Sequence, residues 1–439
     1  MRDLALVLMF AAMMIMTLRK PVFGTYTWAW VSLMNPHQLC YGFAVSLPFA
    51  MLTVLVTLVA FPTAKIRQPF PVTSITIVWL LMVFWMGVTS LFAMAPTDWV
   101  QERWVFVMKI QFMLLITLLL VVEKQQLFLL VVVVTLSIAF FGVKGGIFTL
   151  LTGGSNRVSG PPGGMLAGNN EAAVGLVMVT PFLYWMRMQA TVKWQRTALM
   201  AALVLTVFAI LGTQSRGALL AVLAMSLFLG LKSRYPVRFT LGLVVVLALA
   251  IAFMPDSWTS RMETIGTYQE DTSAQSRLWV WNTLWNAAVD RPFVGAGFCA
   301  EAIEVYIKYA PRDDRWAAFS SLHTTWVAHS IYFQMLGEHG FVGFGLFVTL
   351  WLLVWRRATT VAKAASKVPD LADSIPLLMS MTQVSLIGYA VGGAFLSLAY
   401  LDLPLYLMAY VLLSENIVKR ASKPAPQRAV ALGPTGATA

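Results

Sequence analysis

Apolar residues follow one another in long runs along most of the chain, and short polar connections separate these runs. Because an α-helix rises about 1.5 Å per residue, about 20 apolar residues are needed to cross the core of a bilayer. The pattern therefore predicts an all-α polytopic membrane protein with about 12 transmembrane helices. The predicted spans lie near residues 3–19, 38–61, 72–94, 103–122, 126–149, 170–187, 196–212, 217–231, 238–254, 329–355, 374–398 and 402–418.

The same pattern divides the chain into four segments. Residues 1–254 hold transmembrane helices 1–9, and residues 255–328 form the longest connection, a loop with amphipathic lid helices. Residues 329–420 hold transmembrane helices 10–12. Residues 421–439 are rich in turn formers, lack periodicity and are expected to be a disordered tail. The aromatic-rich segment 21–36 is expected to lie in the membrane interface or to dip into the membrane and return, because tryptophan and tyrosine favour headgroup depth.

Composition agrees with a membrane protein and argues against other classes. The chain is 59% hydrophobic and 11% charged, whereas soluble domains have roughly 45–50% apolar and 25% charged residues. The net charge of +12 comes from small basic clusters between spans and not from a basic arm, so nucleic-acid binding is not indicated. Cys40 and Cys299 are too few and too far apart for a disulfide framework or a zinc site, and two unpaired thiols are expected.

Lysine and arginine placement predicts the orientation. Clusters that include Lys65, Lys124, Arg187, Arg356 and Lys419 all fall on one side of the predicted spans, which the positive-inside rule assigns to the cytoplasm. The tail is then cytoplasmic, and the loop 255–328 lies outside. The remaining cations fall on the outer side, and a polyanionic, lipid-borne substrate would explain them. They are Arg19, Lys20, Arg103, Lys144, Arg157, Arg216, Arg261, Arg277, Arg291, Lys308, Arg312 and Arg315.

Arg216 stands in the turn TQSRG, which joins two predicted spans on the outer side. Thr213 or Ser215 can cap the second helix, which places Arg216 in its first turn. A cation there opposes the helix dipole, whereas a bound phosphate would be favoured by both the backbone donors and the guanidinium. The alternative is an arginine that extends to the lipid headgroups.

Three further arginines are candidates for the same anion. Arg157 lies in the glycine-rich stretch GGSNRVSGPPGG, which can bring backbone close to a ligand or serve as a plain linker. The stretch SAQSRLWVWNTLWNAAVDRP predicts an amphipathic lid helix, which Arg277 begins and Arg291 ends. Its expected apolar stripe is Leu278, Trp281, Leu284, Trp285 and Ala288. An interfacial helix whose arginines bind no ligand is the alternative.

The stretch VAHSIYFQMLGEHGFVGFG carries polar residues at the start of a predicted span. On one helix from residue 329, His329 and Glu338 would face opposite sides roughly 13 Å apart, so they cannot share a metal. No metal motif occurs elsewhere, and a divalent metal is not required. At a helix N-terminus, His329 would stay neutral, as a general base requires. A capping or packing role is the alternative for His329. Glu338 and His339 are expected to hydrogen-bond neighbouring helices.

The glycines of this stretch are interpreted as sites of close helix packing. They are Gly337, Gly340, Gly343 and Gly345.

The order His329, Ser330, nine residues, Gly340, two residues, Gly343 resembles the signature of bacterial O-antigen ligases. Phe344 and Gly345 replace the two threonines that usually end that signature. The TQSRG turn is similar to the family's arginine on a short outer turn. The stretch RLWVWNTLWNAAVDRPFVGAG is similar to the segment before the histidine in the wider ligase and polymerase superfamily. The opening RKPVFGTYTWAWVSLMNPHQLCYGFA resembles exosortase-associated O-glycosylation ligases.

The resemblance implies a metal-independent, inverting glycosyltransferase of lipopolysaccharide biosynthesis. It would act at the periplasmic face of the bacterial inner membrane without a cofactor. The donor would be a glycan on undecaprenyl diphosphate, and the acceptor a sugar hydroxyl of the lipid A core. His329 would be the base and Arg216 an essential cation, with Arg277, Arg157 and Arg291 as further diphosphate contacts.

Other functions stay open on the sequence. An O-antigen polymerase or a protein O-glycosylation ligase would use the same chemistry. A transporter or flippase for lipid-linked sugar is the alternative from another class, although the chain shows no internal repeat. The donor glycan, the acceptor, the oligomeric state and the role of Arg19 and Lys20 are not determined.

Overall fold

The computed structural model describes residues 1–65, 67–232, 241, 255, 272–313, 316, 319 and 326–422. The span expected at 238–254, apart from Leu241, and the tail after residue 422 lie outside the described residues, as does much of the loop 255–328. Within the described part every regular element is helical, which confirms the all-α prediction.

Fourteen α-helices and several short 3-10 turns are described. The helices are α1 (Arg2–Arg19), α2 (Val22–Met34), α3 (Phe49–Ala60), α4 (Ser74–Ser90), α5 (Thr97–Leu120), α6 (Lys124–Leu151), α7 (Asn169–Gln189), α8 (Lys193–Gly212), α9 (Arg216–Lys232), α12 (Thr272–Asp290), α13 (Ile303–Tyr309), α15 (Ile331–Ala365), α16 (Ile375–Gly392) and α17 (Asp402–Ala421). The 3-10 turns include η1 (Pro36–Leu39), η2 (Phe43–Ser46), η3 (Phe61–Thr63) and η5 (Gly393–Phe395).

Five segments are long and apolar enough to cross a membrane, which makes this a multi-pass membrane protein. They are α5, α6, α8, α15 and the stretch Ile375–Phe395, which joins α16 to η5. Three shorter apolar helices accompany them, at Phe49–Thr63, Ser74–Ser90 and Arg216–Gly230. The expected count of twelve spans stays a prediction. The span expected at 38–61 divides into η1, η2 and the 12-residue α3, which begins directly after Pro48.

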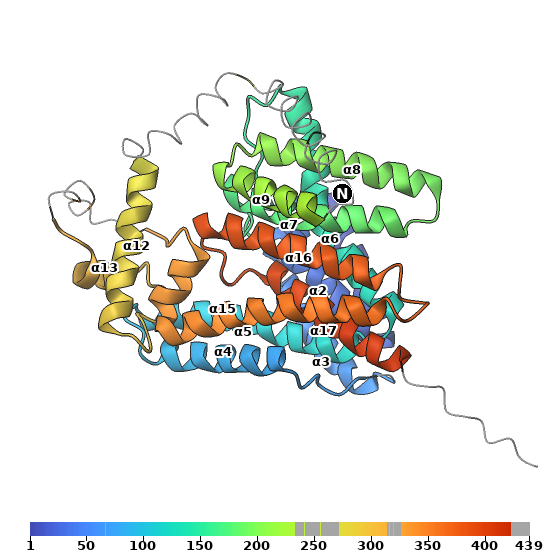
Figure 1. Ribbon diagram of the computed structural model, residues 1–439, viewed down its shortest axis with the longest axis horizontal. Helices are drawn as coiled ribbons and strands as arrows, with labels where there is room; N and C mark the ends of the chain where they lie inside the picture. The colour runs from blue at the N-terminus through green and yellow to red at the C-terminus, as the bar shows by residue number, and fades with distance from the viewer. Residues whose placement is uncertain are drawn as a thin grey trace, which may run out of the picture.

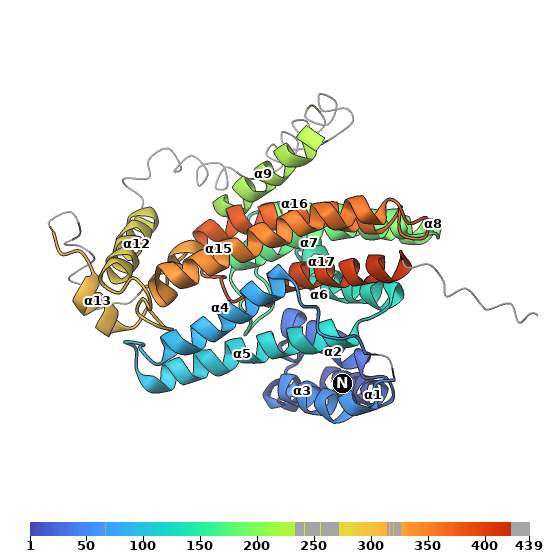
Figure 2. The ribbon, with the colours of Figure 1, turned by 60° about the horizontal axis from the view of Figure 1, so that its bottom comes forward.

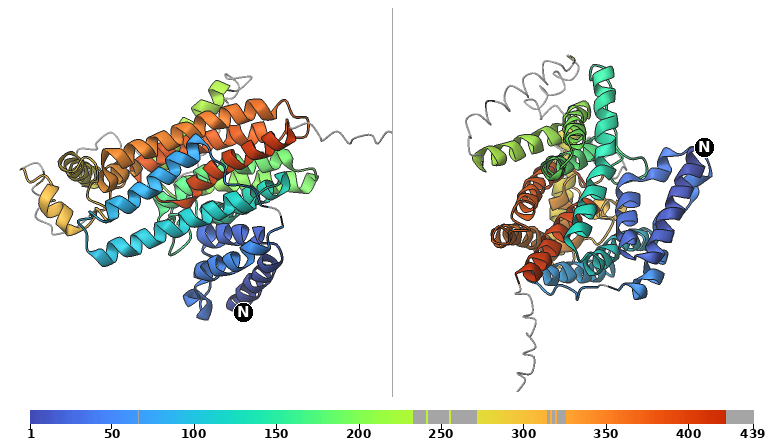
Figure 3. Two further views of the ribbon diagram at one scale, coloured as in Figure 1. Left: turned by 90° about the horizontal axis from the view of Figure 1, so that it is seen from below. Right: turned by 90° about the vertical axis from the view of Figure 1, so that its right-hand side faces the viewer.

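The helices form a bundle with two distinct ends (Figure 1). At one end, α12 and α13 pack across the start of α15, and we call this the cap end. The helices α1 and α3 form a group at the side of the bundle, below α2 (Figure 2). The same group stands apart from α15, α16 and α17 when the bundle is seen from its other end (Figure 3).

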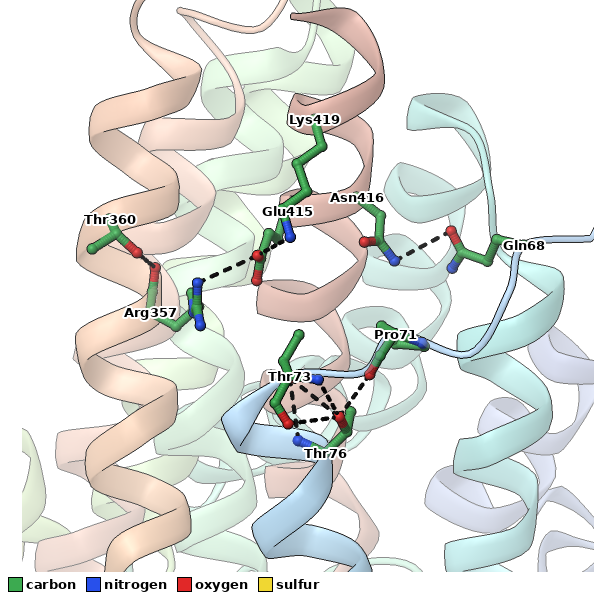
Figure 4. Close-up of polar contacts among 9 residues, drawn as sticks. All are labelled: Gln68, Pro71, Thr73, Thr76, Arg357, Thr360, Glu415, Asn416 and Lys419. Atoms are coloured by element: carbon green, nitrogen blue, oxygen red, sulfur yellow. Dashed lines mark hydrogen bonds and ion pairs between the residues drawn. The ribbon is translucent and has the colours of Figure 1, made fainter. Parts of the chain in front are cut away.

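The opposite end gathers the lysine and arginine clusters that the sequence places on one side, and we call it the basic end. Lys124 at the start of α6 donates to the Asp370 carbonyl, in the connection between α15 and α16. Glu415 on α17 pairs with Arg357 on α15 at 3.4 Å and with Lys419 at 2.5 Å (Figure 4). The basic clusters at Lys124, Arg357 and Lys419 therefore share one end of the bundle, as predicted, whereas most of the predicted cluster Lys232, Arg234 and Arg238 lies outside the described residues.

The aromatic segment 21–36 forms a helix packed inside the bundle, and its expected place at the membrane interface stays a prediction. Most of α2 is buried, including Tyr26 and Trp28, because the helix packs between α1, α3, α5 and α6. The Tyr26 hydroxyl donates to the Gln126 carbonyl in the first turn of α6, at 3.1 Å. This contact places Arg19 and Lys20, which directly precede α2, toward the basic end rather than with the outer cations.

The long helix α15 is interrupted at Gly340, whose backbone has φ +66° and ψ −172°. A Cβ at Gly340 would lie 2.5 Å from the Phe293 carbonyl oxygen, and one at Gly337 would lie 2.6 Å from the Leu284 side chain on α12. Gly343 is equally close to the His339 side chain, so close packing is confirmed at these three glycines. It is wrong for Gly345, which faces open space.

Candidate functional site

A polar cavity of about 400 Å³ opens at the cap end around His329. Six parts of the chain converge on it: α5, the loop before α7 with the start of that helix, α12, the connection from α12 to α13, the segment leading into α15 with the start of that helix, and the segment between η5 and α17. Its polar lining residues are Arg103, Glu171, Glu301, His329, Gln334, Glu338 and Ser397. The cavity is therefore built by segments far apart in the sequence.

His329 precedes α15 instead of beginning it. Ser330 is the N-cap, and its hydroxyl accepts the Phe333 N–H at 3.5 Å. His329 has φ +44°, a left-handed conformation that is uncommon outside glycine. Its backbone N–H donates to the Ser397 hydroxyl at 2.8 Å, which ties it to the segment before α17. The helix begins two residues later than the sequence suggested.

The electrostatic surroundings of His329 favour a neutral imidazole. Partial burial lowers the pKa of His329 below its ordinary value of 6.5, and the Arg277 guanidinium lowers it further. The sequence argument attributed neutrality to the helix dipole; the structure gives burial and a neighbouring cation as the causes. A neutral imidazole can accept a proton.

Glu338 also lines this cavity, so the expectation that Glu338 and His329 face opposite sides is wrong. That expectation assumed one helix from residue 329, whereas His329 lies before the helix in a left-handed turn. The Tyr400 hydroxyl donates to the Glu338 carboxylate. His339 is fully buried and lies 2.7 Å from Thr89 Oγ1 through Nδ1 and 2.7 Å from the Tyr400 hydroxyl through Nε2. The predicted hydrogen bond to a neighbouring helix is therefore confirmed for His339, through Thr89 on α4, whereas Glu338 bonds Tyr400 in the connection before α17.

Arg103 and Glu301 mark the boundary with a second, larger cavity. The Arg103 guanidinium lies 3.2 Å from the Glu301 carboxylate, and both residues line both cavities. The second cavity has a volume of about 690 Å³ and extends toward α2 and the start of α17. Arg103 belongs to the outer-side cations of the sequence pattern, but no sequence signal pointed to Glu301.

Arg216 and Arg157 belong to one connected group at the cap end. Arg216 begins α9, where the Ser215 hydroxyl accepts the Ala218 N–H at 3.3 Å, so Ser215 is the predicted cap. Arg157 Nε donates to the Gln214 amide oxygen at 3.3 Å, and the Gln214 amide nitrogen donates to the Gly154 carbonyl at 3.2 Å. The glycine-rich loop is thereby bound to the TQSRG turn.

The Arg216 turn and His329 contact the same short connection. A Cβ at Gly217, next to Arg216, would lie 3.3 Å from the Phe395 ring, in η5. Ser397, two residues beyond, accepts the His329 N–H. The two predicted catalytic residues therefore flank η5 at one end of the bundle and do not lie at opposite ends.

The prediction that Arg277 begins the lid helix is wrong, because α12 starts at Thr272 and Arg277 is its sixth residue; Arg291 directly follows the helix, as predicted. Arg277 is close enough to His329 to affect its pKa. Arg291 donates to the Phe92 carbonyl in the connection between α4 and α5, at 2.5 Å. None of the four predicted anion-binding arginines, Arg157, Arg216, Arg277 and Arg291, is among the described lining residues of either cavity. The expected stripe of α12 is confirmed at Leu284 and Ala288, which are buried, and wrong at Trp285, which is exposed. Trp279 and Val280 are buried as well, because α13 and α15 cover the helix from two directions.

Among the residues that the structure describes, no group of three or more His, Cys, Asp or Glu side chains could hold a metal ion. Cys40 and Cys299 are both buried and free, as predicted. Burial raises the pKa of Cys299 to about 12, so this thiol stays protonated.

The bundle and its cap-end cavity define a multi-pass helical membrane protein with a polar site at one end. The O-antigen ligase family model matches residues 201–348, which include both Arg216 and His329. This part of the chain belongs to the O-antigen ligase family, and the family implies a glycan-transferring ligase or polymerase. Residues 1–191 match a family of unknown function. No curated protein matches the chain.

Proposed function

We propose that the protein transfers an O-antigen type glycan from undecaprenyl diphosphate to a sugar hydroxyl of the lipid A core, with inversion and without a metal. The site would face the periplasm from the bacterial inner membrane. The observation that carries the proposal is that His329, inside the region that matches the O-antigen ligase family, lines a cavity with polar side chains at the cap end.

The proposed reaction is one displacement at the anomeric carbon of the donor sugar. His329 takes the proton of the acceptor hydroxyl as its oxygen forms the new glycosidic bond. The bond to the diphosphate oxygen breaks on the opposite side, and the electron pair leaves with undecaprenyl diphosphate. General-base assistance of this kind contributes about 10²- to 10⁴-fold in rate.

Guanidinium groups would stabilise the charge that grows on the leaving diphosphate. Arg216 at the first turn of α9 and Arg277 near His329 are the principal candidates. Arg157 would contribute less, because its Nε already donates to Gln214. Arg291 is proposed as a diphosphate contact with the weakest effect, because it donates to the Phe92 carbonyl.

An apolar groove between α15 and α16 supports a lipid-linked donor. It has a volume of about 230 Å³, and its lining runs from Ile331 to Trp355 on α15 and from Leu386 to Ala390 on α16. One end of the groove, at Ile331 and Tyr332, is two residues from His329 in the chain. A polyprenyl tail in this groove would bring its diphosphate to the cap end.

The test uses purified protein, donor glycan on undecaprenyl diphosphate, and lipid A core, with a chelator present. We expect the wild type to form product and His329→Ala to lose transfer while it remains folded by size-exclusion chromatography. Full transfer by His329→Ala would refute the base assignment, and loss of wild-type transfer with chelator would refute metal independence. Polymerised donor as the product would indicate a polymerase, and formation of no glycosidic bond would contradict the proposed transfer.

A further inference from the structure

The larger cavity at the cap end is not explained by the reaction centre. The 690 Å³ cavity lies between α2, α5, the loop 161–166 and the start of α17, whereas His329 lines only the smaller one. The two share Arg103, Gly164, Met165 and Glu301 in their walls, so they adjoin. A molecule that extends beyond the reaction centre can therefore continue into the larger cavity.

The charges around these cavities select against a phosphate group. Their described lining residues include five carboxyl side chains and two cations, Arg103 and Lys109. The carboxyl residues are Glu102, Glu171, Glu301, Glu338 and Asp402. An excess of carboxylates disfavours a diphosphate but provides acceptors for hydroxyl groups. The larger cavity alone has three of these carboxyl residues, Glu102, Glu301 and Asp402, and both cations, so its lining offers acceptors for a hydroxyl-rich group and no surplus of cations for a phosphate.

The remaining lining fits a sugar ring. Trp28, Trp99 and Phe106 provide flat apolar surfaces, and Ser32 and Asn35 provide hydrogen-bonding groups beside them. Small-molecule sites typically combine aromatic side chains with a small number of polar groups, and these polar groups fix the orientation of the ligand. This combination matches a pyranose, which has apolar faces and a rim of hydroxyls.

Asp402 gives the strongest indication of a missing hydrogen-bond donor. Its side chain is only 6% exposed, yet its Oδ2 has no hydrogen-bond partner among the described residues. A buried polar atom without a partner costs about 1–3 kcal/mol, so such atoms are uncommon unless a ligand supplies the partner. Asp402 begins α17 and lines the larger cavity, where a sugar hydroxyl could donate to it.

We propose that the larger cavity is the subsite for the acceptor sugar, with Asp402 as a hydrogen-bond acceptor and Trp99 as a stacking surface. The assignment rests on the proposed function in one respect. The base must touch the acceptor hydroxyl while the leaving diphosphate departs on the opposite side, so the carboxylate-rich cavity beside His329 belongs to the acceptor. The family of unknown function that matches residues 1–191 would then supply the α2 wall of an acceptor site.

Binding without turnover tests the subsite separately from the reaction. The probe is soluble core oligosaccharide freed of lipid A, titrated by isothermal calorimetry into full-length His329→Ala protein. In this background Asp402→Asn should weaken binding about tenfold, because one hydrogen bond to a charged acceptor is lost from an isosteric side chain. Trp99→Ala should weaken binding similarly, and Trp99→Phe should restore most of it. The control is Asp98→Asn, which removes an exposed carboxylate on α5, next to Trp99 but outside the cavity lining; it should not change binding.

The outcomes separate the two proposals. Absence of binding to the His329→Ala parent, or equal binding by Asp402→Asn, would overturn the subsite. If Asp402→Asn weakens binding of the donor glycan but not of the core oligosaccharide, the donor and not the acceptor occupies this cavity. If the wild type binds the oligosaccharide with the expected Asp402 dependence but transfers nothing, the subsite stands and the proposed function fails.

Discussion

At the residue scale, His329 is defined by what surrounds it more than by its place on a helix. Burial and the Arg277 guanidinium both lower its pKa from 6.5, so the neutral base persists into more acidic solution. Transfer should be constant above about pH 7 and fall as the pH drops through a midpoint below 6.5. Arg277→Gln removes the second cause and should move this midpoint upward. Normalised pH–rate profiles measure the shift; a downward shift would contradict the assignment.

Arg157 is hydrogen-bonded to Gln214 in the turn that carries Arg216, but we expect the two arginines to have unequal effects on transfer. Arg216→Ala should lower kcat by about 10²-fold or more, the usual effect of removing a group that stabilises developing charge. Arg157→Ala should cost about tenfold or less, because its Nε is already engaged by Gln214. Arg187→Ala, at the basic end, is the matched control and should leave transfer unchanged. Steady-state kinetics on the three variants would contradict the ranking if Arg157 proved the more important.

At the scale of elements, the conformation of α15 requires a glycine at position 340 but not at position 345. Gly340 has φ +66°, and a Cβ there would meet the Phe293 carbonyl oxygen at 2.5 Å. Gly340→Ala should therefore destabilise the protein by about 1–3 kcal/mol from backbone strain alone. Gly345→Ala, which faces open space, should be neutral or stabilising by up to about 1 kcal/mol. Thermal unfolding of both variants in detergent provides the comparison, and equal losses would refute it.

Several elements followed from hydrophobic pattern alone, and the departures have local causes. The starts of α7, α9 and α17 lie within a residue of their predictions, because polar turns bound their apolar runs. The pattern could not place His329 and Glu338 on one cavity, since the left-handed turn at His329 has no signal in hydropathy. Glu301 and Asp402 were missed for a related reason. Both residues line the larger cavity because α2, α5 and α17 pack together there. The periodicity of the sequence does not predict which helices pack together.

At the scale of the whole molecule, the basic clusters and the proposed reaction site occupy opposite ends of the bundle. The basic end holds the Glu415 pairs with Arg357 and Lys419, and the cap end holds α12, α13 and the two cavities (Figures 1 and 4). A polytopic protein with this distribution should place its basic end in the cytoplasm. The cavities would then open toward the periplasm, where a lipid-linked glycan meets its acceptor.

Cysteine labelling tests this orientation. Ser155 is exposed near the cap end, and Ser366 is exposed at the basic end. In intact cells with a permeable outer membrane, a membrane-impermeant maleimide should label Ser155→Cys and spare Ser366→Cys; in inverted inner-membrane vesicles the order should reverse. Cys40 and Cys299 are buried, so their background should be low, and the wild type measures it. Labelling of both positions from the same side would overturn the two-ended topology, and with it the separation of a periplasmic reaction from a cytoplasmic basic end.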